Sequence, residues 1–301
     1  MVSFNLPLSV PSGKASEYEK NYRLATAGSG RLLLFAGDQK VEHLNDDFYG
    51  PKISQEDAHP EHLFKIASRS RGALLATHLG LVMRYGKQYS KIPYLIKING
   101  KTNLGLNDEK DSSRPWWDVE TVVNFKRQSG LKIVGIGYTV YLGGKNEAQL
   151  LSEAAKAVYQ AHQNGLIAVI WMYPRGKGVK EEDIHTIAGG AGVAACLGAD
   201  FVKVKYPYGT KNPKQTAEKF KEVVAAAGQT KIICVGGNMR QVKEMLTTTK
   251  EQITISGTYG LAIGRNLHQR SLENAVKLAD ELGTVIHKID KPRKSRFLGI
   301  L

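Results

Sequence analysis

Short apolar runs alternate with longer segments of helical periodicity along most of the chain. A short run that is apolar throughout, rather than at every second position, is typical of a strand buried on both faces. Eight such runs occur, and we expect each of them to form a buried strand: 32–35, 72–77, 94–99, 132–138, 167–171, 201–206, 231–235 and 253–256.

The segments between the later runs have the spacing of amphipathic helices. In the clearest one, residues 147–162, leucine, valine and alanine recur every three or four positions and share one face. A strand followed by a helix, repeated around eight strands, predicts an α/β protein with a single (βα)8 TIM barrel. The competing fold, an open doubly wound sheet, would place a GxGxxG turn after the first strand, and none is present. The other helical segments are 181–197, 216–227, 241–248 and 271–286.

Two long connections follow predicted strands, at residues 44–62 and 100–117. Both lie at the carboxyl ends of strands, where barrel enzymes place their chemistry. No low-complexity linker divides the chain. We therefore expect one barrel domain over residues 1–301, with an N-terminal extension and a basic C-terminal tail.

The charge balance favours anionic partners. Lysine and arginine total 42 against 28 acidic residues, a formal net charge of +14 in 301 residues. Such a charge concentrates phosphorylated metabolites, nucleic acids or membrane surfaces around a protein. The cations are dispersed and no base-reading motif accompanies them, so we expect no nucleic-acid partner. The densest cluster, in the last residues from Lys288 to Arg296, is interpreted as a solvated end.

Other patterns exclude several classes of protein. The two cysteines, Cys196 and Cys234, lie in apolar runs and make no disulfide framework. The first residues lack a signal-peptide pattern, and no apolar run approaches the roughly 20 residues that span a bilayer. We therefore expect a cytoplasmic protein without a membrane partner. His59 and His62 have no apparent third ligand, so no metal site is expected there.

Polar residues share faces at the carboxyl ends of the predicted strands. Residues two apart in a strand point the same way. Lys203 and Lys205 therefore share one face of the sixth strand, and both point into the barrel if Val202 and Val204 face the helices. The same rule pairs Trp171 with Tyr173 and Lys97 with Asn99, while Asp38 follows the first strand.

Lysine amines inside an apolar barrel have a definite chemical use. Desolvation and neighbouring cations both disfavour the ammonium form, which lowers the pKa and frees the amine as a nucleophile. A Schiff base with a ketone then accepts electrons during carbon–carbon cleavage. Alternatively, these lysines bind phosphate as cations or pair with Asp38. The spacing does not decide between Lys203 and Lys205 as the nucleophile.

Glycine-rich turns follow the last two strands. Gly236 and Gly237 precede a helix expected to begin near Met239, and Gly264 precedes Arg265. Glycines before a helix expose backbone N–H groups to an anion, and an arginine adds a bidentate partner. The loops after strands seven and eight are the recurrent phosphate site of barrels. We therefore predict a phosphate site there.

At these residues the chain resembles the archaeal-type class I fructose-1,6-bisphosphate aldolases, relatives of deoxyribose-phosphate aldolase. The resemblance covers about residues 32–270. The segment that ends in Asp200-Phe-Val-Lys203 is similar to the family's Schiff-base strand, and this selects Lys203. Trp171-Met-Tyr173 resembles the strand that carries the proton-transfer tyrosine, and Asp38 stands where the family has a catalytic aspartate. Residues 236–237 and 264–266 match the phosphate loops.

Two departures from the family pattern concern the substrate. Relatives often read Asp-His-Gly after the first strand, where this chain has Asp38-Gln39-Lys40. They often have serine before the glycine pair of the seventh strand, where this chain has Val235. Both positions adjoin the predicted site, so the phosphate contacts and the choice of substrate could differ.

The resemblance implies cleavage and formation of fructose 1,6-bisphosphate in glycolysis and gluconeogenesis. Lys203 would attack the C2 carbonyl, and Tyr173 would protonate the enamine left after glyceraldehyde 3-phosphate departs. Asp38 would hold hydroxyls or assist proton transfer, and dihydroxyacetone phosphate would be released last. Lys205 would lower the pKa of Lys203 and, with Trp171 and Lys97, contact the substrate. No cofactor or metal is needed because the iminium replaces a Lewis acid, and a homo-oligomer is expected.

Two alternatives stay open. A transaldolase-like 2-amino-3,7-dideoxy-heptulosonate synthase of the same family would use the same lysine with a different acceptor. A non-catalytic binder of phosphate ligands or nucleic acid would use the positive charge without chemistry at Lys203, and its binding would depend steeply on salt.

Overall fold

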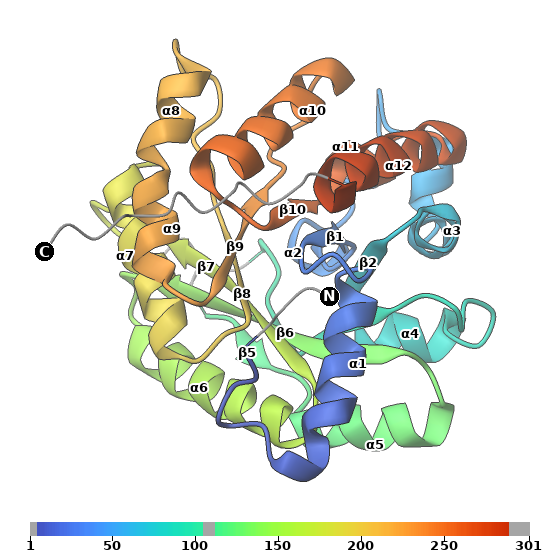
Figure 1. Cartoon of the computed structure of the whole chain (residues 1–301). Helices are drawn as coiled ribbons and strands as arrows, with labels where there is room; N and C mark the ends of the chain where they lie inside the picture. Colours follow the sequence, from blue (N-terminus) through green and yellow to red (C-terminus); the bar gives the residue numbers. More distant parts are fainter. Residues whose placement is uncertain (1–4, 105–111, 289–301) are drawn as a thin grey trace, which may run out of the picture.

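The barrel closes through hydrogen bonds between the first and last strands. A computed structural model describes residues 5–104 and 112–288. Eight parallel strands form a closed barrel in the order β1-β10-β9-β8-β7-β6-β3-β2, with helices around it (Figure 1). The predicted (βα)8 fold is confirmed. The strands are β1 Leu32–Ala36, β2 Ala73–His78, β3 Tyr94–Lys97, β6 Ile133–Leu142, β7 Ile167–Pro174, β8 Phe201–Val204, β9 Lys231–Val235 and β10 Gly260–Ile263.

The connections carry the helices and one small sheet. Asn99–Gly100 (β4) pairs antiparallel with Arg114–Pro115 (β5) beside the barrel mouth. A 3-10 turn, Ser12–Lys14, precedes α1, and another, Gln55–Ala58, lies in the first long loop. The helices are α1 Ala15–Ala25, α2 Gln39–Glu42, α3 Glu61–Arg69, α4 Leu79–Tyr85, α5 Val119–Ser129, α6 Glu147–Gln163, α7 Ile184–Cys196, α8 Pro213–Lys219, α9 Lys221–Ala227, α10 Val242–Glu251, α11 Arg265–His268 and α12 Leu272–Lys288.

Strand alternation divides the apolar residues between two cores. Val202 and Val204 of β8 pack outward in the core shared with the helices, whereas Phe201 points into the barrel with residues such as Leu95 and Val169. Lys203 has the same parity as Phe201 and is buried. The parity predicted for this strand is therefore confirmed up to its last residue, Val204.

Helix α1 closes the end of the barrel where the strands begin. The Tyr22 ring stacks on Phe201, the first residue of β8, with centroids 5.9 Å apart. The Tyr18 hydroxyl donates to Asp200, just before β8. Asp200 also accepts from the Ala168 N–H at 2.7 Å and from His162 Nε2 at 3.0 Å. Since these contacts cover the strand starts, the opposite end of the barrel is left for chemistry.

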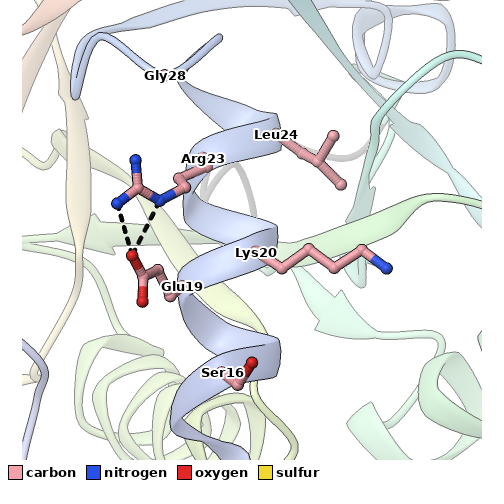
Figure 2. Close-up of a pocket in the computed structure, with 6 residues that line it drawn as sticks. All are labelled: Ser16, Glu19, Lys20, Arg23, Leu24 and Gly28. Carbon is pink, nitrogen blue, oxygen red and sulfur yellow. Dashed lines mark hydrogen bonds and ion pairs between the residues drawn. The ribbon is translucent and has the colours of Figure 1, made fainter. Parts of the chain in front are cut away.

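The outward side of α1 is polar. Figure 2 shows Arg23 directed at Glu19, whose Oε1 accepts from Nε at 2.9 Å and from Nη2 at 2.6 Å. Lys20 and Leu24 project from a neighbouring stripe of the helix. Because the buried side of α1 is aromatic and this side is charged, the helix packs in one orientation.

The prediction of the eighth strand at residues 253–256 was wrong. Gln252–Ser256 forms a π-helical turn that continues α10, and the strand is β10, Gly260–Ile263. The side chain of Ile253 is buried in the outer core, which explains the apolar run. The Ser256 hydroxyl donates to the Ala217 carbonyl at 2.7 Å. A short apolar run does not distinguish a buried helical turn from a strand.

Several other predicted bounds shift, including the following. The sixth strand ends at Val204, two residues earlier than expected. Helix α10 begins at Val242 rather than near Met239. The helix expected over residues 216–227 is divided into α8 and α9 at Phe220. No helix in the described ranges is long and apolar enough to cross a membrane.

We expect Asp200→Ala to lower the free energy of unfolding by about 3 kcal/mol or more. The substitution leaves the Tyr18 hydroxyl, the His162 ring and the Ala168 N–H without their acceptor, and buried unpaired donors are costly. Urea unfolding followed by circular dichroism measures the effect. Asp46→Ala, at an exposed position, is the control. A loss below about 1 kcal/mol for Asp200→Ala would contradict this role of the carboxylate.

Candidate active site

Lys203 presents its amine inside the barrel mouth. The residue is 4% exposed, and its Nζ lies 4.9 Å from the centre of the Trp171 ring. In the described part of the chain, no carboxylate or carbonyl pairs with this amine. Burial lowers the pKa of Lys203, and the charge of Arg265 adds to this, while Asp38 and Glu42 act in the opposite direction. The site therefore favours the neutral, nucleophilic amine more than water does.

A second buried amine, Lys97, shares the Trp171 ring with Lys203. Its Nζ lies 5.5 Å from the ring centre and donates to the Asn99 backbone oxygen at 2.9 Å and to Asn99 Oδ1 at 3.1 Å. Burial lowers the pKa of Lys97 to about 8, opposed by Asp38 and Glu42. The positive charge of Lys203 lowers it further. Two buried amines and two carboxylates thus act on one another at this end of the barrel.

Lys205 does not have the place that the sequence predicted for it. It lies beyond the end of β8, where strand alternation no longer holds, and its amine pairs with Glu181. The cation that lowers the pKa of Lys203 is Arg265, from the loop after β10. The expected effect of Lys205 on Lys203 is therefore replaced by that of Arg265.

The two carboxylates come from the segment after β1. Asp38 is buried, and its Oδ1 has no hydrogen-bond partner in the described residues. Glu42, four residues later on α2, accepts from the Tyr141 hydroxyl at 2.6 Å. Sequence reasoning missed Glu42. Its signal was the spacing of four from Asp38, which places both on one side of a helical turn.

Tyr173 lies in β7 beside Tyr141. The two rings stack with centroids 6.2 Å apart, and the Arg175 guanidinium lies over the Tyr173 ring at 5.6 Å. Burial raises the pKa of Tyr173, and the negative charges of Glu42 and Asp38 raise it further. The hydroxyl therefore keeps its proton at neutral pH and is suited to donate it to a carbanion-like centre.

His78 and Trp116 form the rim next to Lys97. His78 ends β2, and burial together with the charge of Lys97 lowers the pKa of His78 to about 4. Its ring is therefore neutral at physiological pH. Trp116 stacks on it with centroids 4.6 Å apart and is 44% exposed. Trp116 therefore packs at the border of the site.

The predicted phosphate loops meet at Asn266. Its Nδ2 donates to the Asn238 carbonyl at 2.8 Å and to the Gly237 carbonyl at 3.3 Å. Its Oδ1 accepts from the Arg240 N–H at 2.9 Å, and Arg240 Nη2 donates to the Gly236 carbonyl at 3.0 Å. The glycine loop after β9 and the Arg265 segment after β10 are thereby held together. Arg240 was missed because nothing in its local sequence signals this contact.

Gln39, where this chain differs from the family pattern, lies against the loop that carries Gly264. A Cβ built on Gly264 would stand 1.8 Å from Gln39 Oε1 and 3.0 Å from the Ala36 carbonyl oxygen, so a side chain here would displace the Gln39 amide and crowd the end of β1. Gln39 Oε1 is buried without a hydrogen-bond partner in the described residues. The segment after β1 therefore adjoins both the lysines and the phosphate loops.

His62 contacts backbone rather than a metal. Its Nε2 lies 3.0 Å from the His268 carbonyl and 3.1 Å from the Arg270 carbonyl. Within residues 5–104 and 112–288, no three histidine, cysteine, aspartate or glutamate side chains are grouped as metal ligands.

Comparison with known proteins agrees with this geometry. The sequence profile of the DeoC/LacD family aldolases matches residues 32–270. The chain belongs to this family. A relative from Methanocaldococcus jannaschii is 52% identical over 92% of this chain and 88% of its own length, and it is named fructose-bisphosphate aldolase/6-deoxy-5-ketofructose 1-phosphate synthase. A class 1 fructose-bisphosphate aldolase from Halobacterium salinarum is 32% identical over 86% of this chain and 91% of its own length.

Solved structures of family members are also similar. A fructose-bisphosphate aldolase from Slackia heliotrinireducens is 46% identical and superposes with a TM-score of 0.90, covering 96% of this chain and 91% of its own. An archaeal fructose-1,6-bisphosphate aldolase, 27% identical with a TM-score of 0.75, covers 90% of this chain and 99% of its own. Its catalytic lysine is covalently bound to the carbinolamine intermediate of the substrate.

Asp38→Asn should shift the reactivity of Lys203 to lower pH. The Asp38 charge stabilises the ammonium form and raises the pKa of Lys203, so removing that charge lowers this pKa. The rate of reductive methylation of Lys203 against pH, read by peptide mass spectrometry, measures it. Glu42→Gln should move the profile the same way and Asp46→Asn should leave it in place. A shift of Asp38→Asn to higher pH would sink this account.

Proposed function

We propose that this protein is a class I fructose-bisphosphate aldolase with Lys203 as its Schiff-base residue. The observation that carries the proposal is the desolvated amine of Lys203, unpaired in the described residues, in a mouth that also holds Arg265. The family and the two relatives named as fructose-bisphosphate aldolases support the same assignment. The first step is attack of the neutral amine on the C2 ketone, giving a carbinolamine that loses water to form the iminium.

Carbon–carbon cleavage follows from the iminium. The C4 hydroxyl gives up its proton, the C3–C4 bond electrons move into the iminium, and glyceraldehyde 3-phosphate leaves. The Asp38 carboxylate, which has a free buried oxygen among the described residues, is suited to hold or deprotonate a substrate hydroxyl. Tyr173 then protonates the enamine at C3, and water releases dihydroxyacetone phosphate from Lys203. Acid–base assistance of this kind contributes on the order of 10²–10⁴-fold.

The rest of the site serves recognition. The phosphate of the dihydroxyacetone half would be held by Gly236, Gly237, Gly264 and Arg265. The sugar would contact Trp171 and Lys97. Neither a cofactor nor a metal enters this scheme. We further infer a place in glycolysis and gluconeogenesis, in the cytoplasm and as a homo-oligomer, as the sequence suggests.

A second candidate is 6-deoxy-5-ketofructose 1-phosphate synthesis, because the relative from M. jannaschii is named for both activities. It would use the same loops for the phosphate. The 2-amino-3,7-dideoxy-heptulosonate synthase reaction has no comparable support. Activity assays with separate substrates distinguish the three, and a non-catalytic binder would turn over none of them.

Lys203→Met should abolish covalent trapping. Borohydride added with dihydroxyacetone phosphate reduces the Schiff base, and peptide mapping should place the adduct on Lys203 in the wild type. We expect the variant to form none and to lose activity by on the order of 10³-fold or more, because the neighbouring Lys97 amine is engaged in hydrogen bonds to Asn99. Lys205→Met should still carry the adduct on Lys203. A wild type that forms no adduct with any sugar phosphate would refute the proposal.

Asn266→Ala should weaken phosphate recognition and spare the chemistry. Without the side-chain amide, the loops after β9 and β10 lose their common hydrogen bonds. We expect KM for fructose 1,6-bisphosphate to rise by about tenfold or more, equivalent to about 1.4 kcal/mol, with a smaller change in kcat. Trapping with unphosphorylated dihydroxyacetone should be unaffected. Equal losses with both compounds would instead indicate general damage to the barrel mouth.

A further inference from the structure

A carboxylate from the first long loop stands beside the predicted phosphate-binding arginine. Asp47 Oδ2 lies 3.7 Å from Arg265 Nε. The loop that carries it is fixed on the segment after β10, because Gln269 Nε2 donates to the Asp47 carbonyl at 2.9 Å and the Ser54 N–H donates to the Gln269 carbonyl at 3.0 Å. The main chain at Asp47 is therefore held on the segment after β10 by hydrogen bonds that do not involve Arg265.

Asp47 and Arg265 form an ion pair, but their atoms are too far apart for a hydrogen bond. Carboxylates that orient arginines accept hydrogen bonds at about 2.7–2.9 Å. Arg265 Nε is buried and has no hydrogen-bond partner in the described residues. The same Oδ2 atom of Asp47 accepts a hydrogen bond from His43 Nδ1 at 2.5 Å. In this pair the Asp47 carboxylate is already hydrogen-bonded to His43, whereas Arg265 Nε has no acceptor among the described residues.

We propose that Asp47 competes with the substrate phosphate for Arg265 and thereby sets the affinity of the site for phosphorylated substrates. The proposal rests on the proposed function in placing the phosphate at the loops after β9 and β10. An anion on these loops can take the free Nε donor of Arg265. It then shares the guanidinium with Asp47, whose carboxylate is held by His43 and whose main-chain carbonyl is held by Gln269.

Two anions on one guanidinium repel each other, so the bound phosphate is held less tightly than the same loops would otherwise hold it. Partial burial strengthens this repulsion because water screens it less than at the surface. Burial opposes ionisation of Asp47, but His43 and Arg265 together hold the pKa of Asp47 below its ordinary value. The carboxylate is therefore charged when the phosphate arrives. For a reversible aldolase whose products are both phosphorylated, weaker retention favours product release.

The test compares Asp47→Asn with the wild type by calorimetric titration of dihydroxyacetone phosphate and of unphosphorylated dihydroxyacetone. We expect Asp47→Asn to bind the phosphorylated compound about tenfold more tightly, on the order of a single like-charge contact. Binding of dihydroxyacetone should change by less than about twofold. Asp46→Asn, which removes the same charge at an exposed neighbouring position, should behave as the wild type. Equal or weaker binding by a folded Asp47→Asn would overturn the proposal.

Two further variants separate charge from structure. Asp47→Glu keeps the charge and should not tighten binding; tightening equal to that of Asp47→Asn would overturn the proposal. In an Arg265→Gln background, Asp47→Asn should lose its effect, because the two act on the same phosphate contact. A full effect in that background would show that Arg265 is not the shared group, again against the proposal.

Failure of this inference is distinguishable from failure of the proposed function. Borohydride trapping on Lys203 in the wild type reports the aldolase chemistry alone. If the wild type forms the adduct but Asp47→Asn binds dihydroxyacetone phosphate with the same affinity as the wild type, only the competition is refuted. Absence of any adduct on Lys203 refutes the function on which the competition rests.

Discussion

Two lysine amines lie against one buried indole, that of Trp171, and the loss of solvation of their ammonium forms determines how charges are arranged at the mouth of this barrel. Water would hold both as ammonium ions, but between Trp171 and the strand ends the charged form loses its solvation. Lys97 regains part of the loss through Asn99, whereas Lys203 has no such partner among the described residues. The carboxylates of Asp38 and Glu42 supply the opposing charge from one short segment after β1. The environments of the two similar amines therefore differ: the Lys97 amine is held by Asn99, and the Lys203 amine lies against the Trp171 ring.

This charge balance depends on contacts far from the lysines. Helix α1 closes the strand starts, so the polar cavity opens at one end of the barrel only. The long loop after β1 reaches across to the loops after β9 and β10, through Gln39 against Gly264 and through Asp47 beside Arg265. Because Arg265 also acts on the pKa of Lys203, the arginine after β10 and the lysine of β8 belong to one electrostatic unit.

Regular alternation made much of this site predictable from sequence. Inside β7 and β8, the alternation of side chains correctly predicted that Trp171 and Lys203 point away from the helices. It failed at Lys205, because the strand had already ended and a neighbouring carboxylate decided the direction of that side chain. It failed at residues 253–256, because burial against the outer helices makes a helical turn as apolar as a strand. Arg240 and Asp47 contact partners 26 and 218 residues away in sequence, Asn266 and Arg265, and no local pattern encodes such contacts.

The packing of α1 also has a consequence for how the chain folds. Tyr18 bonds to a carboxylate 182 residues later, and β1 pairs with a strand that begins at Gly260. During synthesis, the first helix therefore leaves the ribosome long before its binding surface exists. Its aromatic face remains exposed until at least β8 has been made, and the barrel closes only when β10 arrives. Non-local contacts of this kind slow folding and lengthen the time for which apolar surface is open to chaperones or to neighbouring chains.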